Sequence, residues 1–147
     1  MTATASITRL RIRRLRFLPG FLFDTLRSQR QLRRSEGFVS GYTALGPKFT
    51  FWTVTVWRDR DAMLAFRRSG AHLKAMPKLL DWCDEASVVT LAEASETAPD
   101  TIDAARFLQE GGRISKVRNP SPAQARGELW PDNILPRRGS VILPIRT

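Results

Sequence analysis

The chain has 147 residues, of which 42% are hydrophobic and 26% are charged. This length and composition are typical of one soluble domain and exclude a fibrous or disordered chain. No apolar run approaches the roughly 18 residues that span a bilayer, and the single cysteine and single histidine, Cys83 and His72, form neither a disulfide nor a zinc ligand set. We expect a cytoplasmic protein without a membrane segment or a metal site.

The formal net charge of +10 is concentrated at the start of the chain, where residues 1–36 hold nine arginines against only Asp24 and Glu36. An organellar targeting peptide, or a twin-arginine export signal at Arg13-Arg14, would also be rich in arginine. The apolar stretch that an export signal needs is interrupted here by a Pro-Gly pair and an aspartate. The segment also has strand and helix periodicity, so we expect it to be folded.

The first predicted elements are a strand over residues 7–17 and a helix over residues 21–34. Leu10 and Ile12 alternate with arginines, and the adjacent pair Arg13-Arg14 predicts a bulge. The helix ends in several arginines, which suit the negative end of its dipole. The side chains that we expect to face the core from this helix are Leu22, Phe23 and Leu26.

Two strands are predicted next, over residues 37–45 and 49–57, with a turn between them. The second strand carries aromatic and β-branched residues on both of its faces. One face has Phe49, Phe51, Thr53, Thr55 and Trp57, and the other has Thr50, Trp52, Val54 and Val56. Neither face suits water, so both faces need a cover.

Asp59 is the expected N-cap of the following helix, which closes at Ser69-Gly70. A second helix over residues 71–82 is expected to kink or restart at Pro77, and a strand over residues 86–91 follows it. The order strand, helix, strand, strand, helix, strand predicts an α+β fold, the ferredoxin-like βαββαβ plait, over residues 1–94. Residues 95–147 are expected to form an irregular C-terminal extension, wrapped over the domain or partly loose. It would have a short helix at about 100–110 and then a proline-rich tail.

The sequence around the third strand resembles a known superfamily. Residues 51–59, FWTVTVWRD, followed by Ala62-Met63, Ala65-Phe66 and the run SGAH at residues 69–72, resemble the third strand and second helix of the dimeric α+β barrel superfamily. That superfamily includes antibiotic-biosynthesis-type monooxygenases, haem-degrading monooxygenases and proteins similar to spheroidene monooxygenase. The resemblance covers roughly residues 6–92 and implies a homodimer with sheets packed face to face. A partner's sheet would also supply the second cover that the strand at 49–57 requires.

His72 is the only imidazole and would be the natural proton shuttle near neutral pH. It follows the helix break, where members of the superfamily line a cavity between helices and sheet. Nearby acidic residues could orient the ring, and they are Asp81, Asp84 and Glu85. The alternative is a histidine that caps a helix or bonds a backbone carbonyl.

The resemblance also bears on haem. When Trp57 is aligned with the tryptophan that ends the same strand in the haem-degrading enzymes, their ligand histidine falls at Met76 and their pocket tryptophan falls at Phe66. Their asparagine on the first strand has no counterpart, because this chain has no asparagine before Asn119. These differences argue against that mechanism, although His72 lies one helical turn before Met76 and could still reach a haem iron. We expect no cofactor, with haem as the alternative.

Cofactor-free oxygenation is the other enzymatic interpretation. In it, a bound phenol or quinol supplies its own electron density, and the protein supplies a dry pocket, a base and hydrogen bonds to an oxyanion. The side chains available for these roles are Trp52, Trp57, Phe66, Tyr42 and His72. Trp52 and Trp57 could equally be core or dimer-interface residues.

The arginines of the first strand, Arg9, Arg11 and Arg13, should face away from Leu10 and Ile12, toward the side that a dimer would enclose. Buried arginines need carboxylates, water or an anionic ligand. Arg11 is therefore a candidate for binding an acidic small molecule. The alternative is that these arginines pair with Asp or Glu near a rim.

The positive charge and the plait topology are also compatible with RNA binding. The RNA-recognition signature is absent from residues 49–57, so we do not expect a nucleic-acid partner. We predict a monooxygenase-like protein that binds a small aromatic or acidic molecule between sheet and helices, with His72 as the catalytic residue. The predicted binding residues are Trp52, Trp57, Phe66, Met76 and Arg11. The alternative is a non-enzymatic dimeric module that binds a small molecule or a protein partner.

Overall fold

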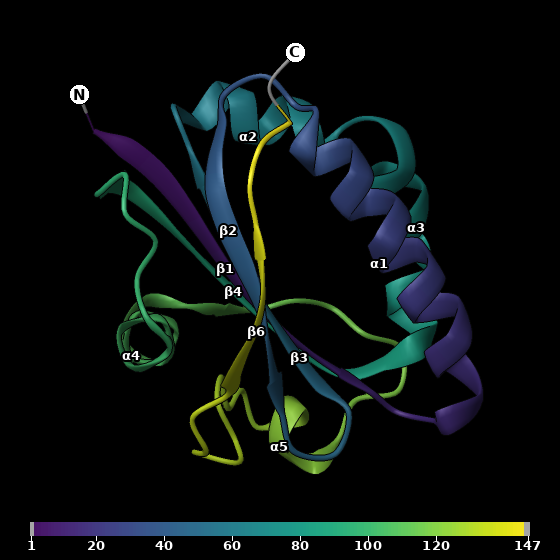
Figure 1. The fold of residues 1–147 in the computed structure, drawn as a ribbon. Coiled ribbons are helices and arrows are strands. Elements are labelled where there is room, and N and C mark those ends of the chain that lie inside the picture. The colour runs from purple at the N-terminus through teal and green to yellow at the C-terminus, as the bar shows by residue number, and fades with distance from the viewer. Residues whose placement is uncertain (1, 146–147) are drawn as a thin grey trace.

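A single antiparallel sheet organises the chain, and the computed structural model describes residues 2–145 of it (Figure 1). The strands are β1 (Ala3–Ile12), β2 (Phe38–Gly46), β3 (Thr50–Trp57), β4 (Cys83–Ala94), β5 (Arg113–Ile114) and β6 (Arg137–Ile142). Their spatial order is β5-β4-β1-β3-β2-β6. The four longest strands, with the helices that connect them, form the predicted ferredoxin-like plait, which confirms the α+β fold class.

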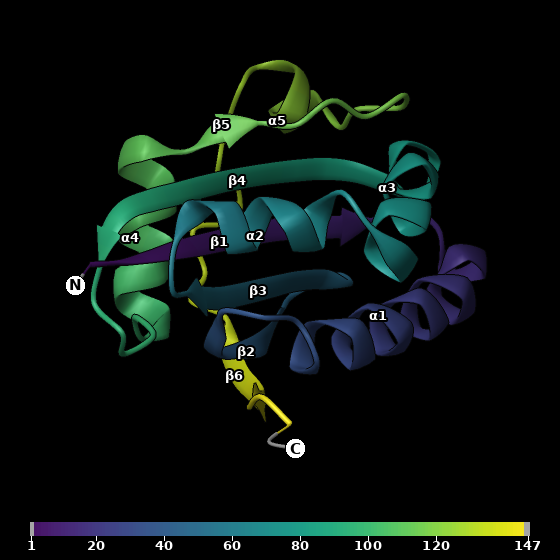
Figure 2. The same cartoon turned by 90° about the horizontal axis from the view of Figure 1, so that it is seen from above.

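Helices cover both faces of this sheet. The helices are α1 (Leu18–Arg33), α2 (Arg60–Arg67), α3 (Gly70–Trp82), α4 (Thr101–Gly111) and the short α5 (Pro122–Ala125). Helices α1 and α3 pack against each other on one side of the sheet, and α4 lies on the opposite side, as Figures 1 and 2 show. Each face of the sheet therefore meets a helix from the same chain.

Local signals set most of the element boundaries. The Asp59 carboxylate accepts a hydrogen bond from the Ala62 amide at 2.8 Å, which confirms the predicted N-cap of α2. Helix α3 continues through Pro77 to Trp82. The first strand lies earlier in the chain than predicted, because β1 runs from Ala3 to Ile12 and a single 3₁₀ turn, Leu15–Phe17, leads into α1. The pair Arg13-Arg14 therefore lies outside the strand, and the irregularity in β1 is a register shift against β4 between Arg11 and Ile12.

The predicted inward face of the first helix is wrong. Leu22, Phe23 and Leu26 are 44%, 60% and 66% exposed, whereas Phe21 and Leu32 are buried. Both sets of residues have a spacing that a helix can place on one face, so the apolar residues alone did not determine how α1 is rotated about its axis. Contacts with the rest of the fold decide the rotation, and they turn polar residues of α1 toward the sheet.

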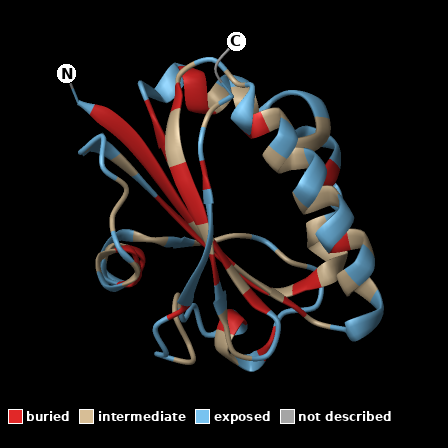
Figure 3. Cartoon of the chain, in the orientation of Figure 1, coloured by how far each residue is buried: buried red, intermediate tan, exposed pale blue. Residues whose placement is uncertain are grey.

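The cover of the second face also differs from the expectation. Trp52 and Val54 are each 1% exposed, and both belong to a core cluster with Ala104, Ala105 and Leu108 of α4. Residues 101–108 of the same chain thus shield part of the face of β3 that was expected to pack against a partner subunit. Figure 3 shows the buried residues running along the central strands and onto the inner side of α4.

The C-terminal extension is more regular than expected. The predicted short helix is present as α4, but the two short strands were missed: β5 pairs with β4, and β6 pairs with β2. Both edges of the plait are therefore extended by residues beyond 94. No helix within residues 2–145 has the length and apolar character needed to cross a membrane.

The role of α4 can be tested with Leu108→Ala. Leu108 is fully buried against the sheet, so its truncation should lower the free energy of unfolding by about 2–5 kcal/mol, measured by urea denaturation. The control is Ile102→Ala on the same helix. The Ile102 side chain is 60% exposed, so this substitution should change the free energy of unfolding by no more than about 0.5 kcal/mol. Equal effects of the two substitutions would show that α4 does not cover the sheet.

Candidate functional site

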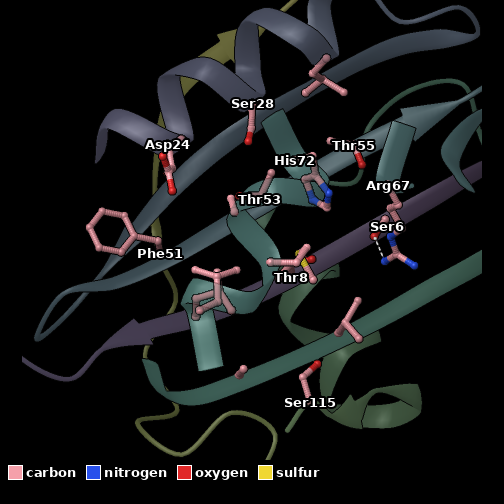
Figure 4. Close-up of a pocket in the computed structure, with 18 of the residues that line it drawn as sticks. Ser6, Thr8, Asp24, Ser28, Phe51, Thr53, Thr55, Arg67, His72 and Ser115 are labelled. Carbon is pink, nitrogen blue, oxygen red and sulfur yellow. Dashed lines mark hydrogen bonds between the residues drawn. The ribbon is translucent and has the colours of Figure 1, made fainter. Parts of the chain in front are cut away.

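A pocket of about 390 Å³ lies between the helical layer of α1, α2 and α3 and the face of the sheet that it covers (Figure 4). This volume is within the range of small-molecule sites. Apolar and aromatic side chains form much of its wall, and they include Phe21, Phe51, Trp57, Phe66, Leu79 and Leu80. The wall therefore suits an apolar or aromatic molecule.

The floor of the pocket is a ladder of hydroxyl groups. Ser6 and Thr8 of β1 lie directly opposite Thr55 and Thr53 of β3 in the antiparallel register, and all four line the pocket. Cross-strand partners on one face lie about 5 Å apart, so their hydroxyls form a continuous polar patch. A ligand with several oxygen atoms could hydrogen-bond to this patch.

Helix α1 closes the pocket with a polar face. Asp24, Thr25 and Ser28 line the cavity, although the same helix exposes Leu22 and Leu26 to solvent. The Asp24 carboxylate accepts a hydrogen bond from Lys78 Nζ of α3 at 3.0 Å. A polar face turned toward the sheet is unusual for a helix of a globular domain, and it indicates a space that is not filled by apolar packing.

His72 projects into the middle of the pocket from the first turn of α3 (Figure 4). Its ring centroid lies 4.7 Å from that of Phe66, and its Nδ1 is buried without a hydrogen-bond partner. Burial lowers the pKa of His72 below its usual value; a backbone hydrogen bond with Arg67 opposes this shift, and the nearby charge of Arg67 adds to it. The imidazole is therefore neutral at pH 7 and able to accept a proton.

The three acidic residues proposed to orient His72 do not do so. Asp81 pairs with Arg118, and Asp84 and Glu85 pair with arginines of β1. These residues are close to His72 in the sequence, but β4 carries Asp84 and Glu85 away from the pocket that α3 lines. No described carboxylate bonds the Nδ1 of His72.

Gln31 of α1, which the sequence analysis did not identify, holds this region in place. Its Nε2 donates to the carbonyl oxygens of Phe66 at 3.2 Å and Ser69 at 2.9 Å, and its Oε1 accepts from the His72 amide at 2.9 Å. Gly70 has φ +60°, which favours glycine, and a Cβ there would lie only 3.0 Å from the side-chain amide of Gln31. Gln31 therefore fixes the turn from which His72 projects.

The structure brings most of the other predicted site residues together. Trp57 stacks at a tilt on Phe66 with centroids 5.3 Å apart, and Met76 lines the same pocket. Trp52 contributes to the pocket lining, but its ring packs edge-on against Trp130 on the opposite face of the sheet, at 6.3 Å. Tyr42, also considered above, belongs to that opposite core, where its hydroxyl donates to the Pro99 carbonyl at 2.6 Å.

Arg11 does not line the pocket, so its assignment as a ligand-binding residue is not supported by its position. Its Nε and Nη2 donate to the two Asp84 oxygens at 2.9 and 2.8 Å. Arg9, 1% exposed, bonds Glu85 at 2.9 Å and Asp132 at 3.0 Å. Arg9 and Arg11 pair with carboxylates, as in the alternative, because the sheet places β4 and its acidic residues beside them; Arg9 does so in the buried interior and not at a rim. Arg13 lies beyond β1, and its Nε donates to the Asp81 carbonyl at 2.7 Å.

Two further groups bear on the chemistry of the chain. Cys83 is fully buried, and burial, with a smaller effect of Asp84, raises the pKa of its thiol to about 12, so it is not a nucleophile. Within residues 2–145, no cluster of three or more His, Cys, Asp or Glu side chains could hold a metal ion.

The buried ion pairs of β1 should be important for stability. Glu85→Gln keeps the shape of the side chain but leaves the Arg9 guanidinium with only Asp132, so we expect a loss of about 3–5 kcal/mol in the free energy of unfolding at pH 7. Asp81→Asn disrupts the more exposed pair with Arg118 and should cost less than about 1 kcal/mol. Comparable losses for the two variants in urea denaturation would contradict this assignment.

His72 should make the stability depend on pH. Because its pKa is lower in the folded chain than the value near 6.5 of an unfolded chain, the unfolded chain binds more protons as the pH falls below about 6.5. His72 therefore makes the fold less stable in acid and has no such effect above pH 7. The free energy of unfolding should therefore fall less between about pH 8 and pH 5 in His72→Gln than in the wild type. If it falls by the same amount in both, the pKa of His72 is not lowered in the folded chain.

Comparisons with known proteins bear on the fold. The sequence matches no protein-family model and no curated protein sequence. A conserved protein from Methanosarcina mazei Go1 is structurally similar, with a TM-score of 0.57 and 14% identity, over 63% of this chain and 94% of that chain.

Two similar structures have described or proposed activities. SnoaB, a cofactor-independent oxygenase from Streptomyces nogalater, here in a mutant form, matches with a TM-score of 0.55 and 16% identity over 68% of this chain and 100% of its own. A proposed antibiotic biosynthesis monooxygenase from Nitrosomonas europaea matches with a TM-score of 0.55 and 15% identity over 62% of this chain and 89% of its own. At such identities the likeness concerns the fold. The chain has the ferredoxin-like α+β fold of the antibiotic-biosynthesis monooxygenase type.

Proposed function

We propose that the pocket binds a small aromatic or acidic molecule and that the chain oxygenates it as a cofactor-independent monooxygenase. The observation that carries this proposal is the neutral His72 imidazole, whose buried Nδ1 has no hydrogen-bond partner and lies in a pocket of about 390 Å³. The described activity of SnoaB, which shares the fold, is consistent with the proposal.

The pocket contains the groups that such a reaction needs. His72 would accept the O–H proton of a bound phenol, and the phenolate formed would give electrons to O₂. Where a CH₂ group conjugated with the phenol becomes a carbonyl, one oxygen atom enters the product and the other leaves as water with the two hydrogens. The substrate then supplies all the electrons. The aromatic walls of Trp57 and Phe66 would hold the ring, and the hydroxyl ladder would bond its oxygens.

Haem is the alternative for the same pocket. His72 is the described pocket residue that could ligate the iron, through a nitrogen that is otherwise unbonded. Bound haem would supply activation of O₂ at its iron. Met76, which stands at the position of the ligand histidine of the haem-degrading enzymes, lines the pocket but offers a thioether in place of an imidazole.

The homodimer and the cytoplasmic setting remain predictions. The homodimer now rests on the resemblance alone, because α4 covers the face that was thought to require a partner; sedimentation velocity at micromolar concentration would measure it. The cytoplasmic setting rests on the single buried cysteine. A dimeric module that binds a small molecule without turning it over remains the non-enzymatic alternative.

The reaction can be tested with anthrone, whose enol tautomer is a phenol conjugated with the carbon that is oxidised to the carbonyl of anthraquinone. His72→Gln should lower the rate of anthraquinone formation, above the uncatalysed background, by about 10²-fold or more. The wild-type rate should also fall in acid, at a pH below the usual histidine pKa of about 6.5, because burial lowers the pKa of His72 and protonated His72 cannot accept a proton. The readouts are anthraquinone absorbance and O₂ consumption.

Leu73→Ala is the matched control, since Leu73 is the exposed neighbour of His72 on the same helix and its loss should leave the rate unchanged. Equal rates for wild type and His72→Gln would overturn the assigned base. Binding of anthrone without turnover would favour the non-enzymatic module. A Soret band that appears when haem is added, and is lost in His72→Gln, would favour the haem alternative.

A further inference from the structure

Three cationic side chains from distant parts of the chain line the pocket. Arg67 lies at the end of α2, Arg113 in β5 and Lys116 just after β5. Figure 4 shows Arg67 and Asp24 on opposite sides of His72. Asp24 is paired with Lys78, so the charge that lacks a partner lies on the Arg67 side of the imidazole.

Arg67 has no carboxylate partner among the described residues. Its only side-chain hydrogen bond runs from Nη2 to Ser6 Oγ, at 3.3 Å, and neither Arg113 nor Lys116 takes part in an ion pair within residues 2–145. Arg67 is partly buried, and burial lowers its pKa, with smaller effects from the nearby charges of Arg113 and Arg60. Arg113 is exposed to solvent, so Arg67 is the cation of the pocket whose charge is least compensated.

The opposite face of the same sheet shows how this chain treats its other buried arginines. Arg9 is bonded to Glu85 and Asp132, and Arg11 is bonded to Asp84 in a bidentate pair. A partly buried guanidinium left beside a second cation costs free energy, which an anion between the two would offset. The contrast indicates that the partner of Arg67 comes from outside the chain.

The geometry of the pocket restricts what this anion can be. A guanidinium fork bonds a planar carboxylate in a bidentate manner. The rest of the cavity, from Phe66 and Trp57 to Leu79 and Phe51, is apolar and aromatic, so it suits an apolar body attached to the anion. A free inorganic ion would leave these walls unfilled.

Building on the proposed function, we propose that the ligand of this pocket is an aromatic carboxylic acid, with its carboxylate held by Arg67 and Arg113 and its ring directed toward His72. The acid group is then the anchor that positions the ring. Arg67 and Arg113, rather than the ion-paired Arg11, are the residues that select an acidic molecule.

The test compares 2-naphthoate with its neutral isostere 2-naphthamide by isothermal titration at low salt. Naphthoate should bind the wild-type chain at least about ten-fold more tightly than the amide, as expected for charge-assisted hydrogen bonds. Added salt should reduce this ratio of affinities, because it screens the charges. Arg67→Met should remove most of this preference, because it should weaken the binding of naphthoate much more than that of the amide. Arg113→Gln, at an exposed residue that should not affect folding, should reduce the same preference.

Arg68→Met is the matched control, because Arg68 is the exposed neighbour of Arg67 and is not among the pocket-lining residues; it makes the same change in net charge. Equal binding of acid and amide to the wild type, or equal effects of the substitutions at 67 and 68, would overturn the inference while leaving the proposed function standing. Failure of both compounds to bind would overturn both proposals. Displacement of naphthoate by equimolar inorganic phosphate would show that the arginines hold a simple anion, and it would overturn the assignment of an aromatic acid.

Discussion

The central constraint on this chain is a β-sheet whose two faces must both be covered. Strand β3 carries large or β-branched side chains on each side, and a strand of this kind is stable only when both sides are shielded from water. Helix α4 covers one side with small residues, Ala104 and Ala105, that allow close contact. The helices α1 to α3 cover the other side less closely, and the space left beneath them is the pocket.

The two faces of the sheet also handle charge differently. On the α4 side, the arginines of β1 form ion pairs with acidic residues of β4 and with Asp132 of the C-terminal extension. On the pocket side, hydroxyl groups of the sheet, the polar side of α1 and the cations Arg67 and Arg113 line the cavity. Buried side-chain nitrogens without a hydrogen-bond partner occur on both sides, Arg9 Nε and Trp52 Nε1 on the α4 side and His72 Nδ1 on the pocket side. What distinguishes the pocket side is its open volume, which supports the proposal that a ligand binds there.

The C-terminal extension contributes to both faces. Helix α4 completes the core opposite the pocket, and the segment of Arg113, Ser115 and Lys116 forms part of the pocket wall. Strand β5 makes this possible, because its pairing with β4 brings Arg113 beside Val88, which also lines the cavity. The extension therefore forms part of the pocket wall, and its Arg113 adds a second cation near Arg67 of the plait.

The sequence by itself determined the order of the elements within the plait, the cap at Asp59 and the grouping of His72, Phe66 and Met76, because periodicity, capping and the spacing along a helix are local properties of the chain. It did not determine the rotation of α1, for which two sets of residues had suitable helical spacing, the edge strands β5 and β6, or the partners of Arg11. Only the tertiary structure decided that α4 covers Trp52, that Gln31 holds the turn before His72 and that Arg67 and Arg113 line the same pocket. Each of these depends on contacts between residues more than thirty positions apart, and such contacts are fixed by how the elements pack together, which no local pattern in the sequence records.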